Sequence, residues 1–141
     1  MSMRRRSHGA RREGGQALVE FALAITVFLM LLLGVFDLGR GIYTYNGLAQ
    51  SAREIARVTS VHLGNPVGTS TATTERVAVQ RGLTPGMGNP TFTCVDLYGV
   101  AATCGSNAYV QVTVSATYAP ISLLGIGGPI TLSSSSSVQI P

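Results

Sequence analysis

The amino-acid sequence predicts an α+β protein in which a long N-terminal helix, first transmembrane and then amphipathic, precedes a small C-terminal antiparallel β-sheet. Three observations predict this fold class. No residue from Phe21 to Phe36 is charged, apolar residues then recur at steps of three and four to about residue 60, and strict alternation begins near residue 109. Because the chain has only 141 residues, it can build one small domain beyond the membrane segment.

The excess of basic residues is confined to the N-terminus. The chain has ten arginines and no lysine, against six acidic residues, and five of the arginines precede Gly14 with only Glu13 opposing them. Residues 1–14 therefore carry a net charge of +4, and the rest of the chain is balanced. A short basic tail is typical of a membrane flank, so we expect no nucleic-acid partner.

Residues 16–36 are predicted to form the transmembrane half of the helix. The twenty residues from Ala17 to Phe36 contain Glu20 as their one charge, and a helix of that length spans about 30 Å, the hydrocarbon thickness of a bilayer. Since the arginines crowd the N-terminal flank, the positive-inside rule predicts a cytoplasmic N-terminus and an exported C-terminal part. We therefore expect a single-pass protein of the cytoplasmic (inner) membrane.

A cleaved secretory signal is the alternative interpretation of this N-terminus, because a basic stretch and an apolar stretch are both present. The sequence "DLGRG" follows the apolar run and carries charges where such a cleavage site needs small neutral residues. Since the helical pattern also continues without a break, a retained membrane helix is favoured.

Residues 37–60 are predicted to continue the helix as an amphipathic half, so that one helix extends from Gln16 to about Ser60. Its apolar stripe consists of Ile42, Tyr45, Leu48, Ala49, Ala52, Ile55, Ala56 and Val58. Its solvated face is expected to hold Arg53, Glu54 and Arg57. Four glycines between residues 34 and 47 each cost a helix roughly 0.5 to 1 kcal/mol relative to alanine, which predicts local bending or melting.

The sequence "RREGGQALVEF" resembles the class III leader of type IV pilins and pseudopilins, which has a basic stretch, a glycine, four residues, a glutamate and an aromatic residue before an apolar helix. The stretches "GVFDLGRGIYTYN" and "SAREIARVTS" extend the similarity. Together they resemble the TadE-like pseudopilins of the tight-adherence (Flp pilus, type IVb-like) secretion system. The resemblance covers nearly the whole chain, is less specific at the C-terminal "ITLSSSSSVQI", and implies a pilin-like fold.

This resemblance implies that a prepilin peptidase cleaves between Gly15 and Gln16 and removes residues 1–15 as a leader. Glu20 and Phe21 then belong to the motif for processing and subunit pairing. The implied function is that of a minor pseudopilin in pilus biogenesis and surface adhesion, placed in the inner membrane or in or at the tip of the pilus. Its implied partners are the peptidase, other pilin and pseudopilin subunits, and the inner-membrane assembly platform.

A role for Glu20 also follows from its place in the membrane segment. A carboxylate costs on the order of 2.5 to 3.5 kcal/mol at the bilayer centre and less near an interface, so it usually has a partner or a function. Cleavage would free the α-amino group of Gln16, four residues away, and that amine could pair with Glu20 of a neighbouring subunit. The alternative is that Glu20 only extends to the headgroups.

Residues 61–90 are predicted to be a loop that contains one short helix. Thr73 or Thr74 is expected to cap it and Gly82 to close it. The apolar contacts of this helix are expected from Val77, Ala78 and Val79. His62 has no second histidine, cysteine or acidic cluster near it in the sequence, so neither a metal site nor a catalytic role is expected.

Residues 91–141 are predicted to form the exported antiparallel β domain, with strands at 91–98, 109–118 and 130–140. In the middle strand one face holds Val110, Val112, Val114, Ala116 and Tyr118. A linker is the alternative for the five serines of the last strand, but apolar residues flank them on both sides. The connection "APISLLGIGGPI" is expected to pack under the sheet; contact with the membrane or with a neighbouring subunit is the alternative.

Cys94 and Cys104 lie in this exported part, where an isolated pair predicts a structural disulfide. Closing a loop of about ten residues would contribute roughly 2 to 3 kcal/mol. An enzyme is not expected and no cofactor is implied, because residues 61–141 hold only two acids and one histidine, without a recognisable catalytic motif. The alternative function is a single-pass, membrane-anchored binding protein that does not enter a filament.

Overall fold

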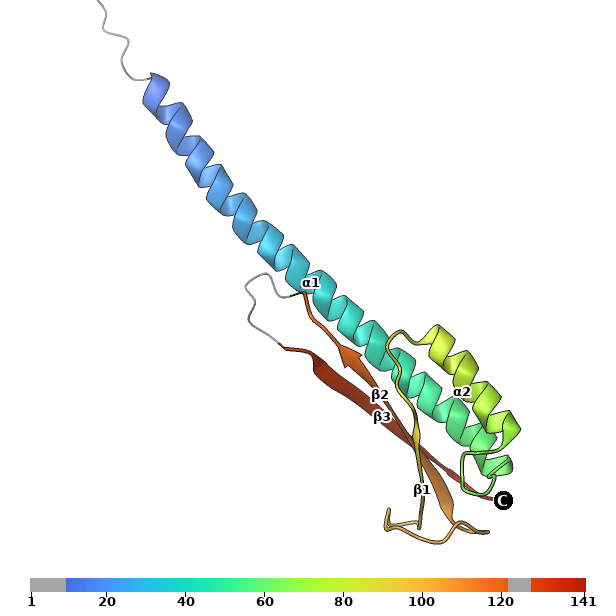
Figure 1. The fold of residues 1–141 in the computed structure, drawn as a ribbon. Coiled ribbons are helices and arrows are strands. Elements are labelled where there is room, and N and C mark those ends of the chain that lie inside the picture. Colours follow the sequence, from blue (N-terminus) through green and yellow to red (C-terminus); the bar gives the residue numbers. More distant parts are fainter. Residues whose placement is uncertain (1–9, 122–127) are drawn as a thin grey trace, which may run out of the picture. The chain divides into compact units, whose positions relative to one another are not determined.

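The computed structural model describes residues 10–121 and 128–141, with side chains from residue 15 onward, and it confirms the α+β class with a pilin-like order of elements (Figure 1). The chain divides into two compact units, the first ending at Asp37 and the second comprising Leu38–Pro141. Among the described residues, the first unit is helical throughout and the second holds every strand.

Helix α1 comprises Ala10–Val61 and is helical at every residue, so the predicted melting around its glycines is wrong. Two of these glycines lie where the second unit packs closely. A Cβ on Gly41 would be 3.9 Å from the ring of Tyr118, and one on Gly47 would be 3.3 Å from the side chain of Thr84. This close packing offsets the cost of glycine in a helix, which is about 1 kcal/mol or less at each position.

Three antiparallel strands, β1 (Thr91–Val95), β2 (Tyr109–Tyr118) and β3 (Ile130–Gln139), form one sheet in the order β1-β2-β3 (Figure 1). β2 pairs with β3 along its whole length, and Tyr118 lies opposite Ile130. The five serines are therefore part of a strand, as their flanking residues predict.

β1 ends at Val95, earlier than predicted, because a turn starts at Asp96. The Asp96 carboxylate accepts hydrogen bonds from the backbone N–H groups of Tyr98 (2.8 Å) and Val100 (2.9 Å). A side chain that bonds to the backbone in this way competes with strand pairing.

The hydrophobic core lies between β2 and the second half of α1. Its fully buried members are Leu48, Ala52, Ile55 and Ala56 of α1 and Val110, Val112 and Val114 of β2. The alternation predicted for β2 is confirmed, since Ala116 and Tyr118 are buried on the same face. The stripe predicted for α1 is wrong at its N-terminal members, because Ile42 is 62% and Tyr45 50% exposed.

Helix α2 comprises Thr71–Leu83 and is the short helix predicted between α1 and the sheet. Ser70 caps it by accepting a hydrogen bond from the Thr73 N–H, so the predicted caps, Thr73 and Thr74, are wrong by a few residues. Thr73 is instead fully buried. The predicted closure at Gly82 is also wrong, because the helix continues past it and ends in extended backbone at residue 84.

Hydroxyl groups join α1 to α2. Ser51 Oγ lies 2.9 Å from Thr84 Oγ1 and 3.2 Å from Gln80 Oε1, and Thr59 Oγ1 lies 3.3 Å from Thr73 Oγ1. The four hydroxyl residues are at most 3% exposed, so these contacts satisfy polar groups that water does not reach. The two helices therefore meet along short polar side chains, and Val79 of α2 remains 52% exposed.

Candidate functional site

The residues that the sequence assigns to processing and pairing lie on one stretch of α1. Gly15, Gln16, Glu20 and Phe21 are all helical and exposed. Gln16 and Glu20 are one helical turn apart and so share a face of the helix. Glu20 has no hydrogen bond or ion pair with any residue whose side chain the structure describes.

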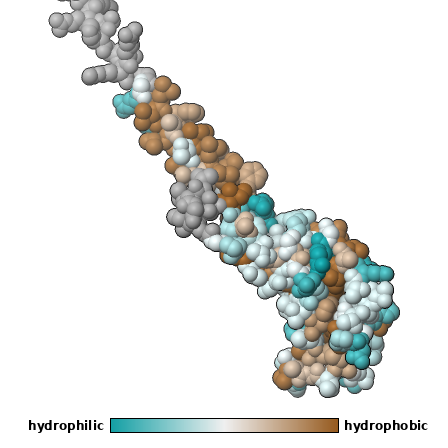
Figure 2. All heavy atoms as spheres, viewed as in Figure 1, coloured by the Kyte–Doolittle hydropathy of each residue, from teal (hydrophilic) through white to brown (hydrophobic). Residues whose placement is uncertain are grey.

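The first unit exposes apolar side chains along its described length. Figure 2 shows apolar side chains on this part of α1, and Phe21 and Val35 are 66% and 70% exposed. Among the described residues, one helix is long and apolar enough to cross a membrane, and it is α1. Its Thr26 hydroxyl donates to the Ala22 carbonyl at 2.7 Å, so this polar group is satisfied within the helix, as lipid requires. The geometry fits a single-pass membrane protein.

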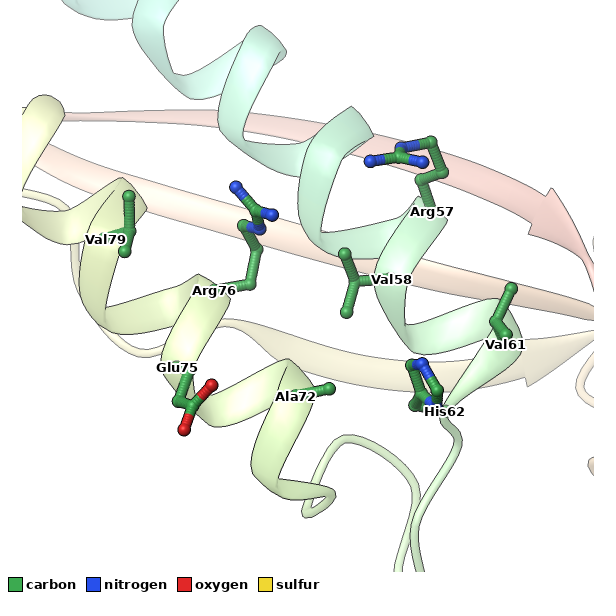
Figure 3. Close-up of a pocket in the computed structure, with 8 residues that line it drawn as sticks. All are labelled: Arg57, Val58, Val61, His62, Ala72, Glu75, Arg76 and Val79. Carbon is green, nitrogen blue, oxygen red and sulfur yellow. The ribbon is translucent and has the colours of Figure 1, made fainter.

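A groove with a volume of about 510 Å³ lies between α1 and α2 (Figure 3). Val58, Val61 and Val79 give it an apolar lining, and Glu75 places a carboxylate in the same groove as His62. The sequence did not predict this groove, because it depends on how two helices pack. None of its lining residues is Ser, Thr or Cys, so the groove contains no nucleophilic hydroxyl or thiol.

Glu54 connects the two helices through arginines. Arg57 Nη2 lies 3.0 Å and Arg76 Nη1 3.6 Å from the same oxygen, Glu54 Oε1. The hydrogen bond from Arg57 lowers the pKa of the Glu54 carboxyl, and the same bond raises the pKa of the Arg57 guanidinium. Arg57 and Arg53 are exposed, in agreement with the predicted solvated face, and solvent-exposed pairs of this kind contribute little to stability.

The predicted disulfide joins Cys94, in strand β1, to Cys104 in the connection between β1 and β2, and the two Cα atoms are 5.3 Å apart. The Asp96 turn lies inside this loop, and Gly99 in it has a φ of +79°. Three side chains of the loop are highly exposed: Leu97 by 72%, Tyr98 by 86% and Val100 by 61%. We call these three residues the apolar tip. The sequence analysis missed it, although an aspartate three residues before a glycine is a turn signal.

Metal binding has no geometric support among the described residues, where no three His, Cys, Asp or Glu side chains gather closely enough to hold an ion. His62 does line the groove with Glu75, but two groups fall short of the three or four ligands of a typical metal site.

No curated protein and no solved structure matches the chain. A family model does match it: residues 15–57 fit the family described as TadE-like protein. The matched region begins at Gly15, contains the apolar run with Glu20, and ends within the second half of α1, before α2 and the sheet. The resemblance found in the sequence is thereby confirmed for this region.

Proposed function

We propose, on the premise that residues 15–57 belong to the TadE-like family, that this chain is a minor pseudopilin of a tight-adherence (Flp-type) pilus. The family match over residues 15–57 supports a pilus-associated role in that system. The observation that carries the finer role is Glu20, an acid near the start of the matched apolar helix and five residues after Gly15, which has no partner among the described side chains.

The proposed processing step is cleavage by a prepilin peptidase between Gly15 and Gln16. This bond lies within helix α1, and a peptidase must unwind the helix locally to reach a peptide bond. Gly14 and Gly15 make that unwinding easier, since each glycine weakens a helix by roughly 0.5 to 1 kcal/mol relative to alanine. The basic leader leaves with residues 1–15, and the apolar helix stays in the membrane.

Cleavage supplies Glu20 with a partner. The freed α-amino group of Gln16 is a cation on the same helix face as Glu20, about 6 Å from it along the helix axis. We infer that the Gln16 amine of one subunit pairs with Glu20 of its neighbour and fixes the register between their helices. The pairing offsets the cost of an isolated carboxylate in the segment, which is on the order of 2.5 to 3.5 kcal/mol at the bilayer centre.

In this proposal the chain crosses the inner membrane once and its second unit is exported. The disulfide between Cys94 and Cys104 supports the exported location of the second unit, because disulfides persist in oxidising compartments. The partners are the peptidase, neighbouring pilin and pseudopilin subunits, and the assembly platform. We assign no catalytic activity to the chain, and its contribution to adhesion is through the pilus.

The test of the pairing is Glu20→Ala together with Glu20→Gln, which keeps the size of the side chain without its charge. Both variants are expected to be cleaved normally and to lose most sheared pili from the cell surface. Thr26→Ala is the matched control, because the Thr26 hydroxyl is already bonded within its own helix. Normal pilus yield with both Glu20 variants would remove the pairing role.

A membrane-anchored binding protein is the second candidate, and the apolar tip favours it. Leu97, Tyr98 and Val100 are held by a disulfide and an Asp96 turn, which is how a rigid binding loop is built. In that case the chain would keep residues 1–15 and would be absent from sheared pili.

A further inference from the structure

The two edges of the sheet differ in how their outer backbone groups are satisfied. β1 forms one edge and β3, dark red in Figure 1, forms the other. On β1 the loop that follows the strand folds back against the edge, where the Ala102 N–H donates to the Cys94 carbonyl at 2.9 Å. The Asp96 N–H likewise donates to the Val100 carbonyl at 2.8 Å, and the disulfide ties the loop to the strand. The chain itself therefore closes the edge at β1.

The hydrogen bonds between β2 and β3 show which backbone groups of β3 point away from the sheet. The Ile140 N–H donates to the Ala108 carbonyl at 2.8 Å. This pair continues the register in which Val138 lies opposite Val110. Because bonded and non-bonded pairs alternate in an antiparallel ladder, the even-numbered residues of β3 bond to β2. The odd-numbered residues direct their N–H and C=O groups outward, and they are Thr131, Ser133, Ser135, Ser137 and Gln139.

The outer side of β3 is open as far as the described residues are concerned. None of them forms a strand, an isolated bridge or a backbone hydrogen bond along it. The strand is ten residues long, pairs with β2 without a bulge, and contains neither a charged residue nor a proline. Proteins usually protect a free edge with charges, prolines, bulges or a covering loop. An unprotected edge of this length is suited to accepting a further strand.

The side chains of β3 indicate which kind of strand fits beside it. On the face toward the core, Leu132 and Val138 are only partly buried, whereas Val110 and Val112 of β2 are fully buried. The sheet ends at β3, so apolar side chains of a further strand on this face would complete the burial. Residues 97–141 contain no charged side chain, so a charged strand would find no opposite charge on β2 or β3.

We propose that β3 binds an uncharged, extended segment of a partner protein as a fourth strand of the sheet, with β-branched apolar residues at every second position. A second copy of β3 is the poorer occupant, because its five serines bring little apolar surface to Leu132 and Val138. The inference goes beyond the proposed function. It concerns the second unit alone and does not depend on cleavage at Gly15.

The probe is a fluorescein-labelled peptide of alternating threonine and valine. The matched control peptide has the same sequence with methylated backbone nitrogens, so it keeps the side chains but donates no backbone hydrogen bond. Binding to the full-length chain in detergent micelles is measured by fluorescence polarisation, and hydrogen–deuterium exchange at the outward amides of β3 locates it.

Two variants alter the edge and one serves as their control. Ser135→Pro removes an outward N–H and leaves the bonds to β2 in place, as prolines do on strand edges. Ser135→Lys keeps the backbone and adds a charge at an exposed residue of the edge. Thr117→Lys is the control, because Thr117 is exposed on the same face of the sheet but belongs to β2.

The peptide is expected to bind, to slow the exchange of the outward amides, and to lose about tenfold in affinity with each Ser135 variant but not with Thr117→Lys. If Ser135→Pro does not fold, Ser135→Lys and the methylated peptide still decide the matter. Absence of binding, equal binding of the methylated peptide, or unchanged affinity of the Ser135 variants would overturn the inference.

Exchange in the chain without peptide separates the other occupants. The outward amides are expected to exchange fast. Slow exchange that disappears on dilution would show that a second copy covers β3, and slow exchange at every concentration would show that this chain covers it. Either result would contradict a partner strand at this edge.

Discussion

Single glycines control how closely the elements of the second unit approach one another. Gly68 has a φ of +87°, a conformation that other residues rarely adopt, and a Cβ added there would lie 2.6 Å from Cγ of Phe92. Gly82, inside helix α2, has ordinary backbone geometry and nothing within 4 Å of its Cβ position. The same residue type is thus indispensable at one position and replaceable at the other.

Gly68→Ala is expected to destabilise the protein by about 1 to 3 kcal/mol through its backbone conformation, with the Phe92 clash in addition. Gly82→Ala is the matched control and is expected to be neutral or to stabilise by up to about 1 kcal/mol, since alanine is the better helix former. Thermal unfolding of full-length protein in detergent micelles, followed by the tyrosine circular dichroism, measures both. Equal stability of Gly68→Ala and the unmodified chain would contradict the packing described here.

Ile42 and Tyr45 mark the limit of what helical spacing reveals about a residue. Their spacing correctly identifies an apolar stripe, but spacing does not say whether protein or lipid covers it. Leu48 and Ile55, further along α1, follow the prediction because they lie on the side of the helix that the sheet covers. Which side of α1 belongs to the core depends on how β2 packs against it, and that is a property of the fold.

At the level of elements, β2 was predictable because alternation over ten residues specifies both a strand and its buried face. The ends of elements were less predictable, because they depend on individual hydrogen bonds. The Ser70 hydroxyl fixes the start of α2 and the Asp96 carboxylate ends β1. The groove between α1 and α2 and the hydrogen bonds of Ser51 depend on how the two helices pack against each other, which no local sequence pattern encodes.

The disulfide stabilises the connection between β1 and β2, and its loss is expected to lower the free energy of unfolding by roughly 2 to 3 kcal/mol. Cys104→Ser removes the cross-link at an exposed residue while Cys94 stays buried. The double variant Cys94→Ser/Cys104→Ser also lacks the cross-link but places a serine at the buried position 94. The difference in stability between the two variants therefore measures the cost of the buried serine, apart from the loss of the cross-link. In chemical denaturation, reductant should lower the free energy of unfolding of the unmodified chain and leave that of the two variants unchanged. If reductant does not change the stability of the unmodified chain, the disulfide makes no such contribution.

At the scale of the whole molecule, the chain joins a unit suited to lipid with a unit that folds around its own core. The membrane helix of the first unit was predictable from hydropathy and from the positions of charges, and the family match covers this unit from Gly15 onward. The second lies mostly outside the matched residues, so its predicted architecture rested on periodicity and on the less specific part of the resemblance. Periodicity predicted the strands and the long helix, whereas the apolar tip became visible only in the folded arrangement.

The central claim is that residues 1–15 are a leader and that the working chain begins at Gln16. Intact mass spectrometry of the protein purified from membranes, with N-terminal sequencing, tests it most directly; Gly14→Ala serves as a control beside a bulky replacement, Gly15→Leu, which is expected to block cleavage. The account predicts a single species of residues 16–141 for the unmodified chain. A membrane form that retains the arginine-rich residues before Gly15 would contradict it.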